Sequence, residues 1–140
     1  MNWFIYTLLA AFTAALTTIF AKFGMKGVNS SLATAIRTTI ALIFIWTVVF
    51  YKGIYKQTFS IPYSSILPLI LCGLASGVSM LLYYKALQLG NASQVAPLDK
   101  LSLLITIFLA IFILKEKASF SIILGAVLMS LGAILIGFGK

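Results

Sequence analysis

The chain has 140 residues, of which 62% are hydrophobic and only 9% are charged, and its mean hydropathy is +1.15. A soluble domain has about 25% charged residues, and so short a chain cannot bury this much apolar surface within itself. The composition therefore excludes a soluble globular domain, a disordered tail and a disulfide-rich secreted module, and it predicts an integral membrane protein.

Composition also limits the chemistry that one chain can perform. The sequence has no His, a single Cys and two acids, Asp99 and Glu116. A Ser-His-Asp triad, a Cys-His dyad and a His/Cys metal cluster are therefore impossible within one chain, and we expect no enzyme, no metal and no cofactor. The formal charge of +8 is scattered between apolar runs, which is typical of residues that flank membrane spans and not of a nucleic-acid-binding stripe.

The apolar runs follow one another along the chain with short polar breaks. A helix that crosses about 30 Å of hydrocarbon needs about 20 apolar residues. Runs of this length lie at about 2–21, 32–51, 64–84, 93–114 and 119–138. They are continuous and do not alternate, which excludes a β-barrel. The sequence predicts an all-α membrane protein with five transmembrane helices in a single domain, 1–140, whose first helix is retained and not cleaved as a signal peptide.

Small residues in two of these runs indicate where helices associate, because lipid tails give apolar side chains no reason to pair. Gly73 and Gly77 are four residues apart in the third run, and Gly125 and Gly132 are seven apart in the last. Packing within one subunit remains an alternative for each pair, although a pair on the terminal helix favours a subunit interface. Together with Pro97, the glycines of the third run would also permit local bending.

The distribution of lysines bears on orientation. Five crossings place the termini on opposite sides and divide the lysines outside the spans four against four: Lys52, Lys56, Lys115 and Lys117 on one face, and Lys22, Lys26, Lys85 and Lys140 on the other. Counting Arg37 and Lys100 toward their nearer face makes the balance six against four. Because a Lys/Arg excess normally fixes orientation, we expect insertion in both orientations in the cell membrane and an antiparallel homodimer.

Three ionisable residues lie within the expected spans: Arg37, Asp99 and Lys100. An intramembrane charge costs about 2.5–3.5 kcal/mol on insertion scales and usually marks function. Neighbours on a helix point about 100° apart, so Asp99 and Lys100 are expected to find partners elsewhere. One interpretation places all three in a substrate-binding cavity, with Trp46 as a further contact.

The alternative interpretation of these residues needs no substrate. Arg37 and Lys100 would extend to the headgroups, and Trp46 would be an interface anchor. Pro97 would begin the fourth helix, which would place Asp99 in its first turn, where the helix dipole favours a carboxylate.

A set of motifs in the second half of the chain is distinctive. It comprises Tyr83–Leu87, Gly90–Ser93, Val95–Leu98, the charged hinge Lys115–Lys117 and the small residues of the last run. This pattern resembles the EamA family of the drug/metabolite transporter superfamily. The resemblance implies a transporter that moves small metabolites or drugs by alternating access. Larger relatives contain two such units in inverted orientation, so two copies of this chain would rebuild that architecture.

The chain also departs from a related branch, the small multidrug transporters, which use a glutamate in the first helix. No acid is present there, so a cation or multidrug exporter would require Asp99 in that role. Basic residues outnumber acids two to one within the spans, which favours substrates with an anionic group, such as amino acids. Two further functions compete with transport: a non-transporting subunit, for example a component of lipid-linked sugar translocation, and an intramembrane enzyme that pairs two copies of Asp99.

Overall fold

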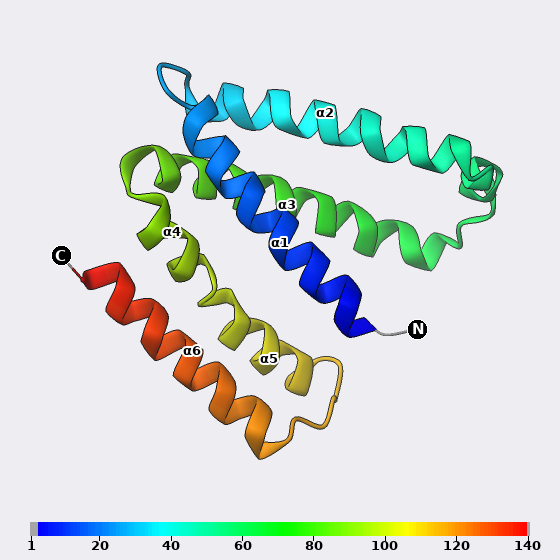
Figure 1. Cartoon of the computed structure of the whole chain (residues 1–140). Helices are drawn as coiled ribbons and strands as arrows, with labels where there is room; N and C mark the ends of the chain where they lie inside the picture. The colour runs from blue at the N-terminus through cyan, green and yellow to red at the C-terminus, as the bar shows by residue number, and fades with distance from the viewer. Residues whose placement is uncertain (1–2, 140) are drawn as a thin grey trace. The chain divides into compact units, whose positions relative to one another are not determined.

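The computed structural model describes residues 3–139, except for the side chain of Phe59. All regular elements within these residues are helical (Figure 1), in the order α1 Trp3–Gly24, α2 Ser30–Tyr51, the 3-10 helix η1 Ile54–Ser60, α3 Tyr63–Leu89, α4 Ala92–Asp99, α5 Ser102–Phe112 and α6 Phe120–Phe138. With α4 and α5 taken as one span, 5 segments of the described chain are long and apolar enough to cross a membrane. The prediction of a five-helix, all-α membrane protein is confirmed.

Helices α1 and α3 extend further than the sequence predicts, because their lysines do not end them. The sequence predicts an end at residue 84 for the third helix, whereas α3 continues through Lys85 to Leu89. Similarly, α1 includes Lys22 and ends at Gly24. A lysine near the end of a span can remain helical while its ammonium group reaches the headgroups. The predicted start at residue 2 lies outside the described residues.

The fourth span is present, but its helix is interrupted. The sequence predicts one helix over 93–114, whereas α4 ends at Asp99 and α5 begins at Ser102. In the intervening turn, the backbone N–H groups of Lys100 and Leu101 donate to the carbonyls three residues before them, both at 3.0 Å. Such bonds belong to a tight 3-10 turn, so the regular α-helical ladder is open at this point.

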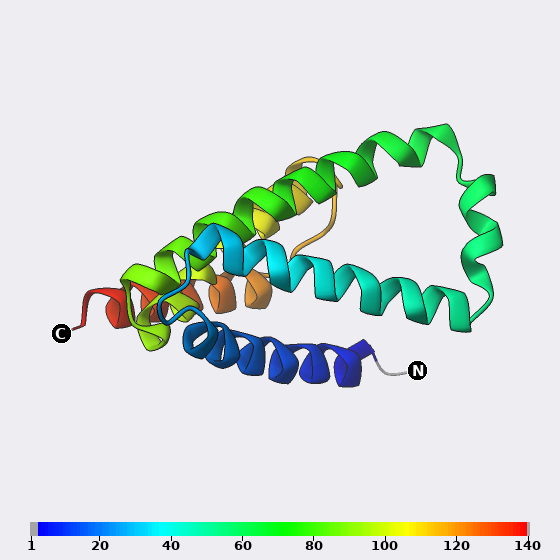
Figure 2. The ribbon, with the colours of Figure 1, turned by 90° about the horizontal axis from the view of Figure 1, so that it is seen from above.

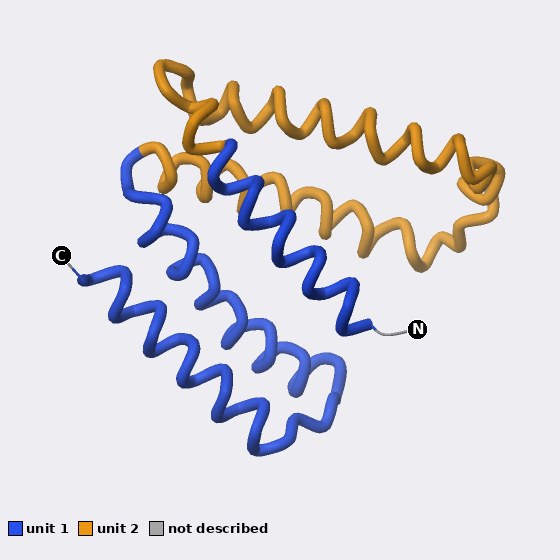
Figure 3. The backbone as a smooth tube through the Cα atoms, viewed as in Figure 1, with its two compact units in different colours: residues 1–20, 89–140 blue, residues 21–88 orange. Residues whose placement is uncertain are grey.

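Contacts divide the chain into two compact units (Figure 3). Unit 1 comprises Met1–Phe20 with Leu89–Lys140, and unit 2 comprises Ala21–Gln88. In unit 1, α6 runs antiparallel beside α4 and α5. The buried side chains of α6 are Ala126, Ser130 and Ala133, so small residues bring these helices together, as expected for packing in lipid.

In unit 2, α2 and α3 meet at one end and separate toward η1 (Figure 2). The buried residues follow this geometry: Ser30 and Thr34 lie at the start of α2, and Tyr84 and Leu87 lie near the end of α3. Asn29 caps α2, because its side chain accepts a hydrogen bond from the backbone N–H of Ser31 at 2.9 Å. The packed part of unit 2 is therefore the end where α2 begins and α3 finishes.

Two hydrogen bonds fix the α1–α2 turn at that same end. The Lys22 ammonium donates to the carbonyl of Leu87 at 2.7 Å, and the Gln88 side-chain amide donates to the carbonyl of Val28 at 3.0 Å. The turn and the end of α3 therefore lie together, which agrees with the placement of Lys22, Lys26 and Lys85 on one membrane face.

The hydroxyl groups of α1 bond to their own helix. Thr7, Thr13, Thr17 and Thr18 each donate to a backbone carbonyl four residues earlier, at 2.9 to 3.2 Å. Because a polar group in lipid must be satisfied internally, these bonds allow α1 to face hydrocarbon despite its threonines.

Candidate functional site

Arg37 is held between two helices of unit 2. It lies seven residues into α2, about 10 Å from the end of the helix at 1.5 Å per residue, and it is half-buried. Its Nη1 donates to the sulfur of Met80 at 3.1 Å, and its guanidinium carbon lies 5.8 Å from the centre of the buried Tyr84 ring. Both partners belong to α3, so the contact links α2 to α3.

The surroundings of Arg37 leave its charge uncompensated within unit 2. Residues 21–88 contain neither Asp nor Glu. A thioether is a weak acceptor, and the tyrosine ring offers only the attraction of its π face. Because a guanidinium has five N–H donors and binds carboxylates or phosphates through two of them at once, this arrangement can bind an anion.

Asp99 and Lys100 form an ion pair at the break in the fourth span. The Lys100 ammonium lies 3.5 Å from a carboxylate oxygen of Asp99, and the side chains of Lys100 and Asp99 are 57% and 40% exposed, respectively. The expectation that Asp99 and Lys100 find their partners elsewhere is wrong, because Lys100 lies in the turn after α4 and the helical spacing does not apply there. An exposed pair of this kind contributes about 0–1 kcal/mol, so either partner can exchange it for another ion.

The predicted helix-start role of Asp99 is also wrong. The helix α4 begins at Ala92 after the cap residue Asn91, so Pro97 lies inside α4 and Asp99 is its last residue. The dipole at a helix C-terminus disfavours a carboxylate and therefore cannot explain this acid. The carbonyl of Pro97 accepts the first hydrogen bond of the 3-10 turn. Pro97 therefore lies next to the break in the helix, which is the position expected of a residue that permits bending.

Trp46 points to a different face of α2 from Arg37. The two are nine residues apart on a continuous helix, which places them about half a turn apart around its axis. Trp46 instead belongs to an aromatic row with Phe50 and Tyr55, whose neighbouring ring centres are 5.7 and 5.5 Å apart. This row runs from the end of α2 into η1, which favours an interface anchor over a contact shared with Arg37.

The predicted site residues thus fall into separate groups. Arg37 and Trp46 belong to unit 2, and Asp99 and Lys100 belong to unit 1. Met80 and Tyr84 were not predicted as partners of Arg37. Their spacing of four residues places both on one face of α3, which is the signal that could have identified them, but it does not say which helix they meet.

The predicted glycine contacts differ from those in the structure. A methyl group added at Gly73, Gly77, Gly125 or Gly132 would meet no neighbouring atom of the described chain within 4 Å. At Gly137, the same methyl group would lie 2.7 Å from the side chain of Leu98. The close approach of α4 and α6 therefore uses Gly137, and the four predicted glycines are left open to other contacts.

Comparison with known proteins assigns the chain to a family, because the sequence model of the EamA-like transporter family matches residues 1–138. The chain belongs to this EamA-like family. A Sinorhizobium protein described as an uncharacterized transporter in the cobO 3′ region is 42% identical to this EamA chain over 135 residues, which are 96% of each protein. No solved structure matches. The EamA chain is therefore a membrane transporter of the drug/metabolite type, as its resemblance implies.

The charged hinge of the EamA chain ends α5 with a defined geometry. Lys115 has a φ of 55°, in the left-handed region that residues other than glycine seldom adopt. The backbone N–H of Glu116 donates to the carbonyl of Ala110 at 3.2 Å, so a left-handed residue and a hydrogen bond back to the last turn close the end of α5. The hinge is therefore a built helix end and not a loose linker.

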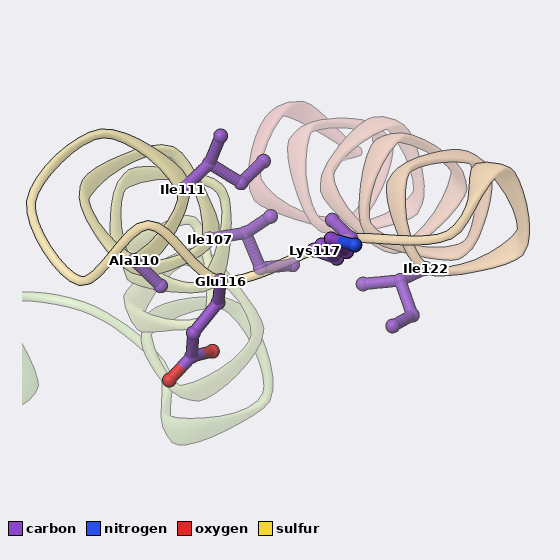
Figure 4. Close-up of a pocket in the computed structure, with 7 residues that line it drawn as sticks. Ile107, Ala110, Ile111, Glu116, Lys117 and Ile122 are labelled. Atoms are coloured by element: carbon purple, nitrogen blue, oxygen red, sulfur yellow. The ribbon is translucent and has the colours of Figure 1, made fainter.

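A small cavity of about 80 Å³ lies beside this hinge in unit 1. Figure 4 shows Ile107 and Ile111 of α5 and Ile122 of α6 around it, with Glu116 and Lys117 at the hinge. The cavity is too small for a metabolite, since ligand pockets measure about 300–1,000 Å³. Within the described part of the chain, no group of three His, Cys, Asp or Glu side chains could hold a metal ion.

Proposed function

We propose that the protein is a secondary transporter of small metabolites that carry an anionic group, such as amino acids, and that it works in the cell membrane as an antiparallel homodimer. The observation that supports this proposal is the environment of Arg37. Its guanidinium lies well inside a span, is oriented by Met80 and Tyr84, and belongs to a unit without a carboxylate. An intramembrane charge without a counter-ion is costly, and an anionic substrate would supply one.

In the proposed mechanism, Arg37 binds the carboxylate or phosphate group of the substrate. Lys100 and Asp99 supply further polar contacts, because their exposed ion pair can open and re-form. One subunit rocks against its inverted partner around a site near the middle of the membrane. The open helical ladder after Pro97 allows the fourth span to bend during this motion. Trp46 remains a weaker candidate for a substrate contact.

In the alternative of a cation exporter, Asp99 would have to exchange Lys100 for the cationic substrate. Lys100 already places a positive charge 3.5 Å from the carboxylate, which reduces its attraction for a cationic drug. If Asp99 nevertheless served that function, Asp99→Asn would abolish pH-dependent transport in proteoliposomes. A non-transporting subunit would tolerate Arg37→Leu without loss of function.

The first test is a thermal-shift screen of the purified protein against amino acids, their neutral carboxamides and cationic drugs, since a ligand stabilises the state it binds. Stabilising solutes are then assayed for counterflow in proteoliposomes. We expect solutes with a free carboxylate to stabilise the protein and to be transported, and their carboxamides to do neither.

Variants of Arg37 then assign the contact. Arg37→Gln should abolish both the thermal shift and the counterflow, whereas Arg37→Lys should retain part of each because it keeps the charge but loses the two-point geometry. Lys56→Gln is the matched control, because it removes one positive charge from the same unit. Counterflow that is equal in wild type and Arg37→Gln would contradict the proposal.

A further inference from the structure

An open cavity lies at the α1–α2 turn, apart from the residues of the proposed transport site. It has a volume of about 190 Å³ and is lined by Lys22, Phe23, Met25, Lys26, Leu87 and Gln88. All of these residues belong to unit 2. Because α1 ends at Gly24 and α3 ends at Leu89, and spans end where the hydrocarbon gives way to headgroups, the cavity lies at headgroup level.

The walls of this cavity are held by contacts between distant parts of the chain. Met25 and Leu87 are buried, with exposures of 5% and 0%. The Lys22 ammonium is fixed by its 2.7 Å bond to the Leu87 carbonyl, and the Gln88 amide joins the turn at Val28. The cavity is therefore a built feature of unit 2 and does not depend on one flexible loop.

The charge of the cavity is positive and is not balanced within its unit. Lys22 and Lys26 both line it, while residues 21–88 include six Lys or Arg and no Asp or Glu. The Lys26 ammonium lies 5.7 Å from the centre of the Phe23 ring, which is itself 66% exposed. An exposed aromatic ring in a cavity lined by two lysines suits a ligand that is both anionic and amphipathic, such as a lipid at the interface.

We propose that this cavity binds the phosphate group of an anionic phospholipid. Lys22 and Lys26 provide the positive charges that face the phosphate, and Phe23 lies against the glycerol and upper acyl region. Basic pockets at the ends of transmembrane helices recognise anionic headgroups in this way. The site uses none of Arg37, Asp99 and Lys100, so it stands whether or not the transport proposal does.

The test measures lipid binding by the detergent-purified protein with native mass spectrometry and thermal shift. The ligands are phosphatidylglycerol, zwitterionic phosphatidylcholine and soluble glycerol phosphate. We expect phosphatidylglycerol to bind and to raise the melting temperature, and the other two to do so weakly or not at all. Lys26→Gln should weaken phosphatidylglycerol binding about fivefold, the effect of one lysine at an anionic lipid surface.

Lys56→Gln is the control, since it removes the same charge from the exposed helix η1 of the same unit and should leave lipid binding unchanged. Lys22→Gln is less informative alone, because Lys22 also ties α1 to Leu87. The proposal is overturned if Lys26→Gln binds phosphatidylglycerol like wild type, or if Lys56→Gln weakens binding equally, which would indicate net charge alone. If glycerol phosphate binds as tightly as the lipid and is lost in Lys26→Gln, the site recognises soluble phosphate and the lipid assignment is wrong.

Discussion

Arg37 belongs to a helix long and apolar enough to span the membrane, and the side chains around it compensate its charge only in part. Met80 and Tyr84 are soft, polarizable groups that orient the guanidinium without neutralising it. An acid in their place would have formed a buried ion pair and occupied the donors that we assign to the substrate. The sequence predicts the importance of Arg37 because charge is rare in a span, but not its partners, because these depend on how α2 and α3 are aligned.

At the same scale, the backbone of Lys115 offers a direct test of the hinge. A side chain in the left-handed region costs about 1–2 kcal/mol, whereas glycine adopts it freely and loses about 0.5–1 kcal/mol through its greater chain entropy. Lys115→Gly should therefore raise the melting temperature of the protein in detergent, measured by intrinsic fluorescence.

Lys117→Gly is the matched control for this hinge variant. Lys117 has the same charge and lies two residues away, but its φ is negative. Its replacement should lower the melting temperature, because glycine adds conformational entropy to the unfolded chain and relieves no backbone strain at this position. A fall of equal size in both variants would show that Lys115 is not strained.

The sequence predicts neither the ion pair of Asp99 and Lys100 nor the position of Asp99 at the end of its helix. The spacing rule that separates neighbours by about 100° holds only on a continuous helix. Pro97, two residues before Asp99, is expected in the first turn of its helix because that is where proline fits best. The structure places it inside α4, which moves Asp99 from the start of a helix to its end.

Among the elements, α4 and α6 make the closest approach in unit 1, and one glycine permits it. A methyl group at Gly137 would lie 2.7 Å from three carbon atoms of the Leu98 side chain. Gly137→Ala should therefore destabilise the protein by about 1–3 kcal/mol from overpacking, offset by about 1 kcal/mol for the better helix former. We expect a net fall in melting temperature.

A double-mutant cycle tests that this fall comes from the Leu98 contact. Leu98→Ala removes the obstructing atoms, so the double variant should be less destabilised than the sum of the two single ones. Gly132→Ala is the control on the same helix, because its added methyl group meets no neighbour within 4 Å, and it should not lower stability within one chain. Additive effects in the cycle would contradict the assigned contact.

The existence of the elements could be predicted, whereas their ends and contacts could not. Five apolar runs and the need for about 20 residues per crossing suffice to count the spans. The charge of Lys85 predicts an end to the third helix, but its long side chain lets α3 continue to Leu89. The sequence shows which residues are glycines. Which glycine lies at a close helix contact, here Gly137, depends on how α6 packs on α4.

At the scale of the whole molecule, the lysine balance makes a prediction about orientation. The bond between Lys22 and the Leu87 carbonyl places the α1–α2 turn beside the end of α3, as the predicted topology requires; Lys140 lies outside the described residues. Two C-terminal fusions test this balance of four lysines on each face: one to a reporter that is active only in the cytoplasm, and one to a reporter that is active only outside the cell. We expect both fusions to give a signal.

Changing the balance should fix the orientation. The double variant Lys52→Gln and Lys56→Gln leaves two lysines against four, and the positive-inside rule then places the face of Lys22 in the cytoplasm. Only the cytoplasmic reporter should remain active, because the C-terminus shares that face. If wild type already activates one reporter alone, dual insertion and the antiparallel homodimer lose their support.

The turn at Lys100 and Leu101 has a mechanical consequence. Kinking an intact helix inside a bilayer exposes carbonyl and amide groups that lipid cannot solvate, at a cost of several kcal/mol for each. In the fourth span, the backbone N–H groups of Lys100 and Leu101 already bond to carbonyls three residues earlier, and not four as in an α-helix. We therefore expect the two halves of this span to change their mutual tilt more easily than an intact helix would, because the turn between them is held by 3-10 bonds of poorer geometry.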